Sequence, residues 1–595
     1  MLDDQMKLKS QVCQAINLIK HSSSFEVLDP WYERSFTFLG CDKSVALTPD
    51  DMTQYHLPAI HETFEEKIKM LMHSSDFFSI TTDSWTDLMT RKMVAITAHF
   101  YPRDSWDLQR LTFDVAELSG SHTSINLREH VKQKLEAYPA FLASMVVDGA
   151  LNKQGNAPLL VVVVDDDDDA EWCFAHQLHL VCLDTLRNHS DSLESLRTFI
   201  KKFKTSANHK ENLRAIFARN PIFVPHSRVD LDWECSSEEY SDSDSDSEEE
   251  DFEFTHSNVP SLILDVKSRW RSTFLMLERF LLLSPSLDIL AATDHDLEVP
   301  SFLDRHTFKC IKDALEPLAE VSIQAQSLTT PTGAHVPSWI AYINEKLTLL
   351  MEKHKNTAST EIISGVKNAF DCRLMKYFNF TENDTPSVFL RAAAVHPKFH
   401  HLPWLTQSQK NQVWNQMALD VSKLLADSNQ LQVHKPRIKD EIRILLSMLQ
   451  SGSTESVDDP AQWYAQCEYL QDIPAIIPLI KMCLSIPATS SPPESVFSVS
   501  GYIDRKARAC LLRSGVGAMT IIAKNLHIWP DHTILVDKSV ETLLRLRSSA
   551  SASSSIISES PPSSPVSLPI ETIYISSDSS PGTSNTEDDE NLFEI

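Results

Sequence analysis

Apolar and polar residues recur with different periods in successive parts of the chain. Over residues 8–72 the apolar residues have helical spacing, as Val12, Ile16 and Ile19 illustrate. The next part is rich in β-branched and aromatic residues, which predicts three strands, over residues 77–82, 93–101 and 108–118. Because short polar connections join these strands, we expect an antiparallel meander.

A helix and a further strand follow the meander. The pattern predicts a helix over residues 126–138 and an apolar strand over 143–147 that ends at Asp148. Strands interrupted by a helix are typical of a mixed α/β sheet. Helices are then expected over residues 176–188, 193–217 and most of 265–450.

These changes of pattern divide the chain into six regions and predict an α/β plus all-α protein. The regions are an N-terminal helical region (1–74), an α/β core (75–225), an acidic loop (226–260), a helical domain (261–455), a further segment (456–535) and a Ser/Pro/acidic tail (536–595). The loop and the tail cannot bury enough apolar surface to offset the entropy of ordering, so we expect both to be disordered.

The charge of the chain limits how it meets nucleic acid. The net charge is −28 over 595 residues, and Asp230 to Glu253 alone hold 13 acids without a Lys or Arg. Removing those 13 charges still leaves −15. DNA contacts are therefore expected only at local basic patches. The serines among these acids suit acidophilic kinases, and a plain solvated linker is the alternative.

Cysteine usage and hydropathy indicate the compartment. The 10 cysteines include no Cys-x-x-Cys pair, so we expect reduced thiols. The first 20 residues lack the apolar core of a signal peptide, and no apolar run is long enough to span a bilayer. We expect a soluble intracellular protein without a membrane partner.

Three acids stand out by their settings. Asp83 and Asp148 each follow an apolar strand, and Glu494 begins a predicted helix after two prolines. Carboxylates held on separate rigid elements are what a two-metal phosphoryl-transfer site requires. For each acid alone, a turn or a helix cap is the alternative interpretation.

Several segments resemble motifs of the hAT superfamily, the relatives of BED-finger transposases. Residues 81–86 and 147–152 resemble the segments with the family's first two catalytic acids. Further similar segments follow in the family's order: 172–180, 268–279, 395–399, 486–498 and 524–526. The resemblance thus covers roughly residues 75 to 530.

The resemblance implies a ribonuclease-H-like core interrupted by a large helical insertion domain. In such a core Asp83, Asp148 and Glu494 form one metal-binding triad, and Mg²⁺ or Mn²⁺ is the cofactor of an active enzyme. Residues 456–535 would complete the core and form the dimerisation region, with intramolecular packing as the alternative for its apolar residues. Arg269 and Trp270 would lie near the active site, where Trp270 stacks on a displaced base unless it is a core tryptophan.

The chain departs from the family in three places. Ser495 follows Glu494 where the family has Arg, no BED zinc finger precedes Asp83, and Val161 to Asp169 is a run foreign to the pattern. The missing finger puts sequence-specific binding to transposon ends in doubt.

Other residues have possible binding roles. Cys173, His176, His179 and Cys182 are zinc-ligand types, but spacings of three on one helix favour a structural role. Lys201, Lys202 and Lys204 would contact DNA phosphates or form a solvated helix face. In the tail, Ile573, Tyr574 and Ile575 precede serines and Asp578, which resembles a SUMO-interacting motif.

We therefore predict a domesticated hAT transposase-like protein of the nucleus, a homodimer or higher oligomer that associates with DNA and regulates transcription. An active transposase with Mg²⁺-dependent DNA cleavage and strand transfer is the alternative, because all three acids are present. A scaffold that binds no nucleic acid is the third possibility.

Overall fold

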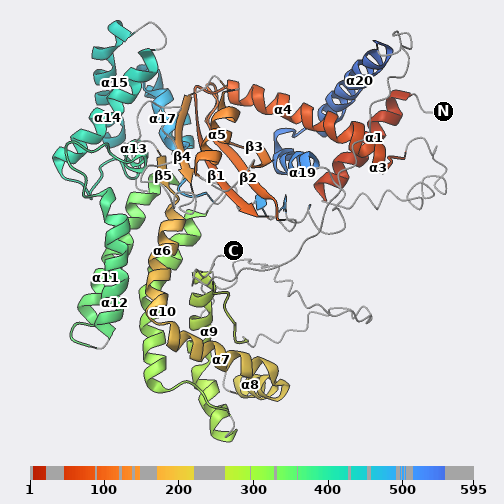
Figure 1. Ribbon diagram of the computed structural model, residues 1–595. Helices are drawn as coiled ribbons and strands as arrows, with labels where there is room; N and C mark the ends of the chain where they lie inside the picture. The colour runs from red at the N-terminus through yellow and green to blue at the C-terminus, as the bar shows by residue number, and fades with distance from the viewer. Residues whose placement is uncertain are drawn as a thin grey trace, which may run out of the picture.

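The computed structural model has a mixed β-sheet at its centre, with helices on both faces and a helical arm that extends away from it (Figure 1). It describes residues 4–21, 46–86, 90–118, 124–136, 138, 141–147, 170–219, 261–267, 269–294, 297–326, 332–357, 359–426, 431–451, 457, 459–490, 496, 497, 499, 500, 503 and 513–556.

The sheet has five strands in the order β3-β2-β1-β4-β5. β2 is antiparallel to β1 and β3, whereas β4 is parallel to β1 and β5 is parallel to β4. The strand bounds are β1 Phe77–Thr86, β2 Lys92–Phe100, β3 Gln109–Glu117, β4 Phe141–Val147 and β5 Ala170–Trp172. The predicted meander is therefore one half of the sheet.

Helices precede, connect and follow the strands. Before the sheet come α1 Asp4–Lys20, α3 Pro49–Asp51, the π-helical turn η3 Met52–His56 and α4 Leu57–His73. Helix α5 Ser124–Leu135 links β3 to β4, and β5 leads into α6 Phe174–Arg187, α7 Ser190–Thr205 and α8 Ala207–Arg219.

The helical domain and the C-terminal elements complete the chain. The helical domain holds α9 Trp270–Thr293, α10 Phe302–Ala325, η5 Gly333–His335, α11 Val336–Lys353, α12 Ser359–Leu374, η6 Met375–Tyr377, α13 Val388–Val395, α14 Gln407–Ala426 and α15 Leu431–Ser451. After it come α16 Pro460–Ala465, η7 Glu468–Asp472, α17 Ile477–Leu484, α19 Arg513–Asn525, η9 Leu526–Ile528 and α20 His532–Ile556.

The two faces of the sheet differ in polarity because successive residues of a strand point to opposite sides. On one face, even-numbered residues of β1 and β2 such as Ile80 and Ile96 belong to a core shared with α1, α4, α5 and α19, to which Met93 and Ala95 of β2 also contribute. The odd-numbered residues of the other face include a set of buried polar side chains: Ser79, Thr81, Asp83, Thr97 and His99. Helix α17 covers the start of this polar face, where the Ser485 and Ser79 hydroxyls lie 3.1 Å apart.

The free edge of β3 is closed by the C-terminal part of the chain. The Asn525 side chain donates to the Thr112 carbonyl at 2.6 Å and accepts from the Thr112 amide at 3.0 Å. One step along the edge, His527 Nε2 lies 3.1 Å from the Arg110 carbonyl. Helix α19 approaches β3 so closely that only glycine fits at position 517, because a Cβ there would lie 2.3 Å from the Val115 oxygen.

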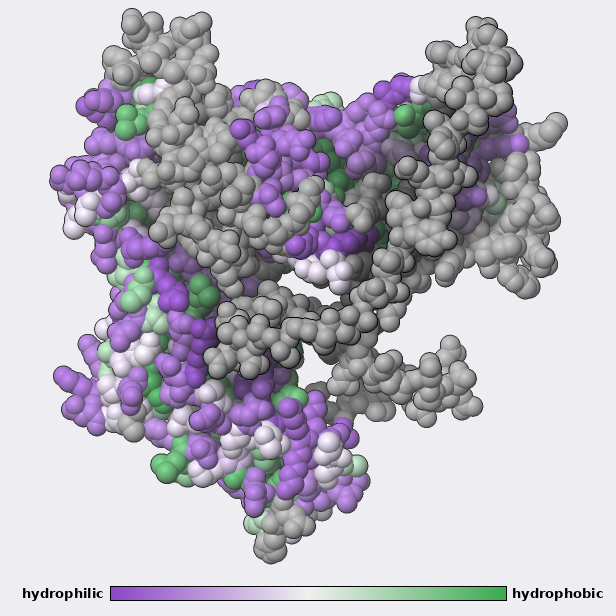
Figure 2. Space-filling model, in the orientation of Figure 1, coloured by the Kyte–Doolittle hydropathy of each residue, from purple (hydrophilic) through white to green (hydrophobic). Residues whose placement is uncertain are grey.

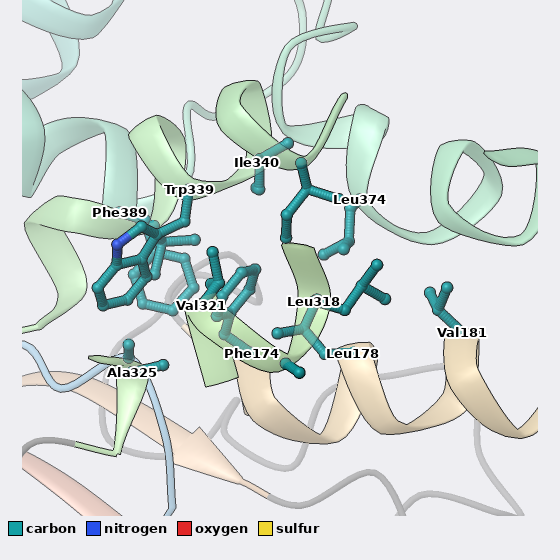
Figure 3. Close-up of a cluster of buried hydrophobic side chains, with 14 of the residues drawn as sticks. Phe174, Leu178, Val181, Leu318, Val321, Ala325, Trp339, Ile340, Leu374 and Phe389 are labelled. Atoms are coloured by element: carbon teal, nitrogen blue, oxygen red, sulfur yellow. The ribbon is translucent and has the colours of Figure 1, made fainter. Parts of the chain in front are cut away.

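A second core joins α6 to the helical domain (Figure 3). The side of α6 that carries Phe174, Leu178 and Val181 faces α10 to α13, and the Phe174 and Trp339 rings stack with centroids 5.9 Å apart. The partner side chains drawn there are Leu318, Val321, Ala325, Trp339, Ile340, Leu374 and Phe389. This packing fixes the arm to the element that leaves β5.

Most predicted elements are present, and the coarse prediction of a mixed α/β sheet plus a helical domain is confirmed. Three details were wrong. The first strand runs on through Asp83 to Thr86, residues 193–217 hold two helices instead of one, and the predicted tail from residue 536 begins inside α20, which reaches Ile556. Residues 226–260 and 557–595 lie outside the described ones. No described helix combines the length and apolar character needed to cross a membrane.

Substitution of Gly517 tests the closure of the sheet edge. We expect Gly517→Ala to lower the free energy of unfolding by about 1–3 kcal/mol, because the new methyl group forces α19 away from β3. The matched control is Gly365→Ala in α12, where an added Cβ meets nothing within 4 Å. That change is expected to be neutral or to stabilise by about 0.5–1 kcal/mol. Thermal unfolding followed by circular dichroism measures both, and equal effects would contradict the close approach.

Candidate functional site

Asp83 lies inside β1, on the polar face of the sheet. Its Cα is paired with that of Ala95 on β2, and the residue is 7% exposed. The Ser84 amide donates to its Oδ1 at 2.7 Å. Asp83 is therefore a buried carboxylate on a rigid element, not a residue of the turn that follows the strand.

The strand that precedes the second predicted acid runs directly beside Asp83. β4 is parallel to β1, and its last residue, Val147, pairs with Thr82. Asp148 is the next residue in sequence and lies outside the described residues. Asp148 therefore directly follows Val147, and Val147 pairs with Thr82, the residue before Asp83.

The chain that follows the third predicted acid also reaches this end of β1. The Phe497 ring packs on Trp85 with centroids 4.1 Å apart. Trp85 and Asp83 are two residues apart on one strand, so they point to the same face of the sheet. Val496 is buried in the same core as β1. Glu494 itself lies outside the described residues, two positions before Val496.

A metal site can be tested only against the acid that the structure describes. Asp83 offers an oxygen ligand of the type that Mg²⁺ and Mn²⁺ prefer, at the point where the other two segments converge. Within the described ranges, no three His, Cys, Asp or Glu side chains lie close enough together to hold an ion. A complete site would need Asp148 and Glu494 as well.

A buried hydrogen-bond network lies next to Asp83 on the polar face. Thr97 on β2 bonds through its hydroxyl to the Thr81 hydroxyl and, at 3.1 Å, to His99 Nε2. Burial, and then the positive charge of Arg110, lower the pKa of His99 to about 3. His99 is therefore neutral at physiological pH, and the network holds β1 and β2 together without adding charge beside Asp83.

A buried extended segment leads from α17 toward Glu494. The Phe174 amide donates to the Ala488 carbonyl at 3.0 Å, and the Ser490 amide donates to Cys173 Sγ at 3.3 Å. On its other side, the Gly333 amide donates to the Ile486 carbonyl at 3.0 Å. These bonds fix residues 486–490 between α6 and the start of α11.

The Cys/His segment has a packing role in this arrangement. Cys173 precedes α6 and accepts the hydrogen bond from Ser490, whereas Cys182 is fully buried among apolar residues. The His176 and His179 rings stack on each other with centroids 5.9 Å apart. The two cysteines therefore lie in the interior, apart from the stacked pair of histidines, and the structural interpretation accounts for Cys173 and Cys182.

Arg269 and Trp270, which the resemblance places near the active site, differ in exposure. Trp270 begins α9 and is 5% exposed, packed in the larger core, while Arg269 before it is exposed. The buried ring is not available to stack on a base in this conformation, so the core interpretation of Trp270 describes it.

An ion pair ties this motif to α7. Arg197 donates to both oxygens of Asp265 at 2.8 and 2.7 Å, and the Thr273 hydroxyl donates to the same carboxylate at 2.6 Å. Burial alone would raise the pKa of Asp265, but these hydrogen bonds outweigh it and hold the pKa below its ordinary value. The charged pair therefore fixes α7 against the turn that carries Arg269.

The lysines predicted to contact DNA follow Arg197 along α7, and they are exposed. Lys201, Lys202 and Lys204 lie on the last turns of α7, and Lys210 and Arg214 are exposed on α8. The surface in this part of the arm is mainly hydrophilic on the face shown in Figure 2. These helices therefore present cations to the solvent on a fixed support.

The apolar residues expected to mediate dimerisation are buried within the chain. Ile473, Ile476 and Ile480 belong to the larger core, and Met519 and Ile522 to the core beneath the sheet. All five are fully buried. The intramolecular alternative therefore accounts for these residues, and a homodimer would need another surface.

Two further predicted groups fall outside the described residues. These are the tail residues Ile573, Tyr574 and Ile575, and a second basic patch of Arg505, Lys506 and Arg508, whose sequence likewise suits contacts with phosphates. The SUMO-interacting motif and the second basic patch stay predictions from sequence.

Sequence reasoning missed three residues that shape the site: Phe497, His99 and Arg197. The polar residues at every second position of β1 and β2 are the signal that could have found His99, because they share the face of Asp83. For the contacts Trp85–Phe497 and Arg197–Asp265, which join distant segments, the sequence has no local signal.

Comparison of the sequence with protein-family models and with curated proteins finds no match in either. The resemblance to hAT transposases therefore depends on the motifs quoted above, and the function is argued from them and from the geometry.

Protonation of His99 gives a test of the buried network. Because its folded pKa of about 3 lies below the ordinary 6.5, stability is lost as the pH falls from 6.5 toward 3. At pH 5 this residue alone is expected to lower the free energy of unfolding by about 2 kcal/mol, since one pKa unit is worth about 1.4 kcal/mol. His99→Gln should reduce the difference between urea unfolding at pH 7 and at pH 5. If the difference between pH 7 and pH 5 were the same in His99→Gln as in the wild-type protein, His99 would be accessible to protons in the folded state.

Proposed function

We propose that this chain is a nuclear, DNA-associated regulatory protein derived from a hAT transposase, with a ribonuclease-H-like core kept as its scaffold. The observation that carries the proposal is the convergence of three distant segments at one end of β1. These are Asp83 itself, the end of β4 beside Thr82, and the Phe497 segment on Trp85.

Sheet topology supports the same ancestry. A mixed sheet with three antiparallel strands, two parallel strands on one side and helices on both faces suits the core that the motifs imply. A helical domain separates β5 from the segment that returns to the sheet at residues 496–525, as expected of a core with an insertion.

Covalent geometry favours a shared carboxylate pocket. Consecutive Cα atoms lie about 3.8 Å apart, so the Cα of Asp148 lies about that far from the Cα of Val147, which pairs with Thr82. A strand continued by one residue would direct Asp148 to the face of Asp83. Mg²⁺ or Mn²⁺ bound by Asp83, Asp148 and Glu494 would supply Lewis-acid stabilisation for phosphoryl transfer.

Association with DNA rests on the cations of α7 and α8. The Arg197–Asp265 pair holds the exposed Lys201 and Lys204 on the same support as Arg269. Rigidly presented lysines neutralise phosphates without reading sequence. This suits a protein whose overall charge is strongly negative, because only local basic patches can then meet phosphates.

A regulatory role is preferred over catalysis because Ser495 stands where the family has Arg after the catalytic Glu, so an electrostatic partner of that acid is missing. The active transposase remains the second candidate, because the convergence at β1 would also assemble a working triad.

Nuclease activity separates the two candidates. With supercoiled plasmid DNA and Mg²⁺ or Mn²⁺, we expect the wild-type protein to cut no faster than Asp83→Asn, as gel electrophoresis would measure. Metal-dependent cutting that disappears in both Asp83→Asn and Asp148→Asn would overturn the regulatory proposal in favour of the transposase. The exposed Asp107→Asn serves as the matched control, because Asp107 lies in the loop between β2 and β3.

Salt dependence tests DNA association. We expect duplex DNA to bind with an affinity that falls as salt rises, with a slope of about 0.9 per phosphate contact in a log–log plot. Combined Lys201→Glu, Lys202→Glu and Lys204→Glu changes should weaken binding and flatten that slope, as fluorescence anisotropy would show. Lys353→Glu with Lys355→Glu, two exposed lysines at the end of α11, is the matched control. Wild-type protein that does not bind DNA would instead favour a pure interaction scaffold.

A further inference from the structure

A small cavity lies between the sheet and α17, at the end of β1 opposite to Trp85. Its volume is about 190 Å³. The start of β1, the hairpin after β2 and the first turns of α17 form its walls. Phe77, Ile477 and Met482 supply apolar surface, and Tyr101, Arg103 and Lys481 bring polar groups. From Phe77 to Asp83 the strand extends about 20 Å, so the cavity is separate from the site proposed above.

Lys481 is unusual for a lysine because only 7% of its surface is exposed to solvent. Its ammonium donates to the Pro102 and Arg103 carbonyls at 2.7 and 2.6 Å and lies 4.9 Å from the centre of the Trp106 ring. An ammonium group has three N–H donors, so these two bonds leave one for a further acceptor. Burial lowers the pKa of Lys481, and Asp104 and Asp76 oppose that shift.

Tyr101 carries the second donor. The residue is 2% exposed, and its hydroxyl is buried without a hydrogen-bond partner among the described residues. A buried polar group without a partner is unfavourable, so such a group calls for an explanation. A ligand acceptor in the adjoining cavity would satisfy it.

The charges of the wall favour an anion. The one acid in the wall, Asp76, is paired with Arg103 at 2.6 Å, and that guanidinium also donates to the His73 carbonyl at 3.0 Å. The charge of Asp76 is thereby neutralised, and the charge of Lys481 has no carboxylate bonded to it within the described part of the chain. The lining itself thus holds two cations and one acid beside apolar surface, and the carboxylates of Asp104 near Lys481 and Asp459 near Tyr101 lie outside the lining.

We propose that this cavity binds a small organic anion, a carboxylate or a phosphate with an apolar body, through Lys481 and Tyr101. The apolar body would lie against Phe77 and Ile477. Because α17 leads directly into residues 486–490, a ligand here would strengthen the junction between the sheet and the segment that returns to it.

Titration of the full chain with phenyl phosphate and with benzoate tests the proposal. We expect a saturable rise in the melting temperature with at least one of them, and the tighter of the two identifies the anionic group. Ile477→Trp is designed to fill the cavity and should abolish the rise while the protein stays folded. A rise that persists in Ile477→Trp would overturn the proposal, since the anion would then bind elsewhere, and so would the lack of any saturable rise in the wild-type protein.

Tyr101→Phe gives a second, independent readout. Removal of the hydroxyl should raise the melting temperature of the free protein and weaken anion binding about tenfold, the effect of one lost charge-assisted hydrogen bond. Tyr469→Phe is the matched control, because Tyr469 is 60% exposed, and it should change neither quantity. Unchanged affinity in Tyr101→Phe would exclude the hydroxyl as a ligand donor and overturn the site as proposed.

Discussion

The sheet depends on hydrogen bonds that its own strands cannot make. β3 is an edge strand, and its outward amide and carbonyl groups would be exposed to any competing strand. Asn525 satisfies both groups of Thr112 with one side chain, and Gly517 lets α19 lie against the same edge. These contacts hold α19 and η9 at the edge of β3, while Phe497 packs on Trp85 at the end of β1.

Burial of polar groups on one face of the sheet imposes a second constraint. Thr81, Thr97 and His99 are bonded to one another, so they lie in the interior without leaving donors and acceptors unmatched. His99 is neutral at physiological pH, so it adds no positive charge to the buried polar face that also holds Asp83.

Local patterns predicted the elements well because they depend on neighbouring residues. The β-branched and aromatic runs of β1 and β2 and the helical spacing of Val12, Ile16 and Ile19 in α1 depend on nearby residues, so the positions of these elements could be predicted directly. The position of Asp83 was predicted less well: the strand continues to Thr86, because Trp85 and Thr86 still pair with Met93 and Lys92 of β2. Trp85 also packs on Phe497, hundreds of positions away.

Two interpretations of the C-terminal apolar residues stayed open in the sequence for a related reason. Apolar side chains such as Ile476 and Met519 indicate that they will be buried, but not which surface will bury them. In the structure that surface belongs to the same chain. The same ambiguity applied to Trp270, whose ring lies in the core. For the exposed Lys201 and Lys204, charge and helical spacing sufficed, because exposed residues need no distant partner.

Thr112 and Asn525 are 413 positions apart, which has a consequence for biosynthesis. While the ribosome is still making the helical domain, β3 has already emerged and its edge has no cover. A nascent chain in this condition can pair with a neighbouring chain on the same messenger RNA, so chaperones that shield strand edges should matter more for this protein than its stability alone indicates.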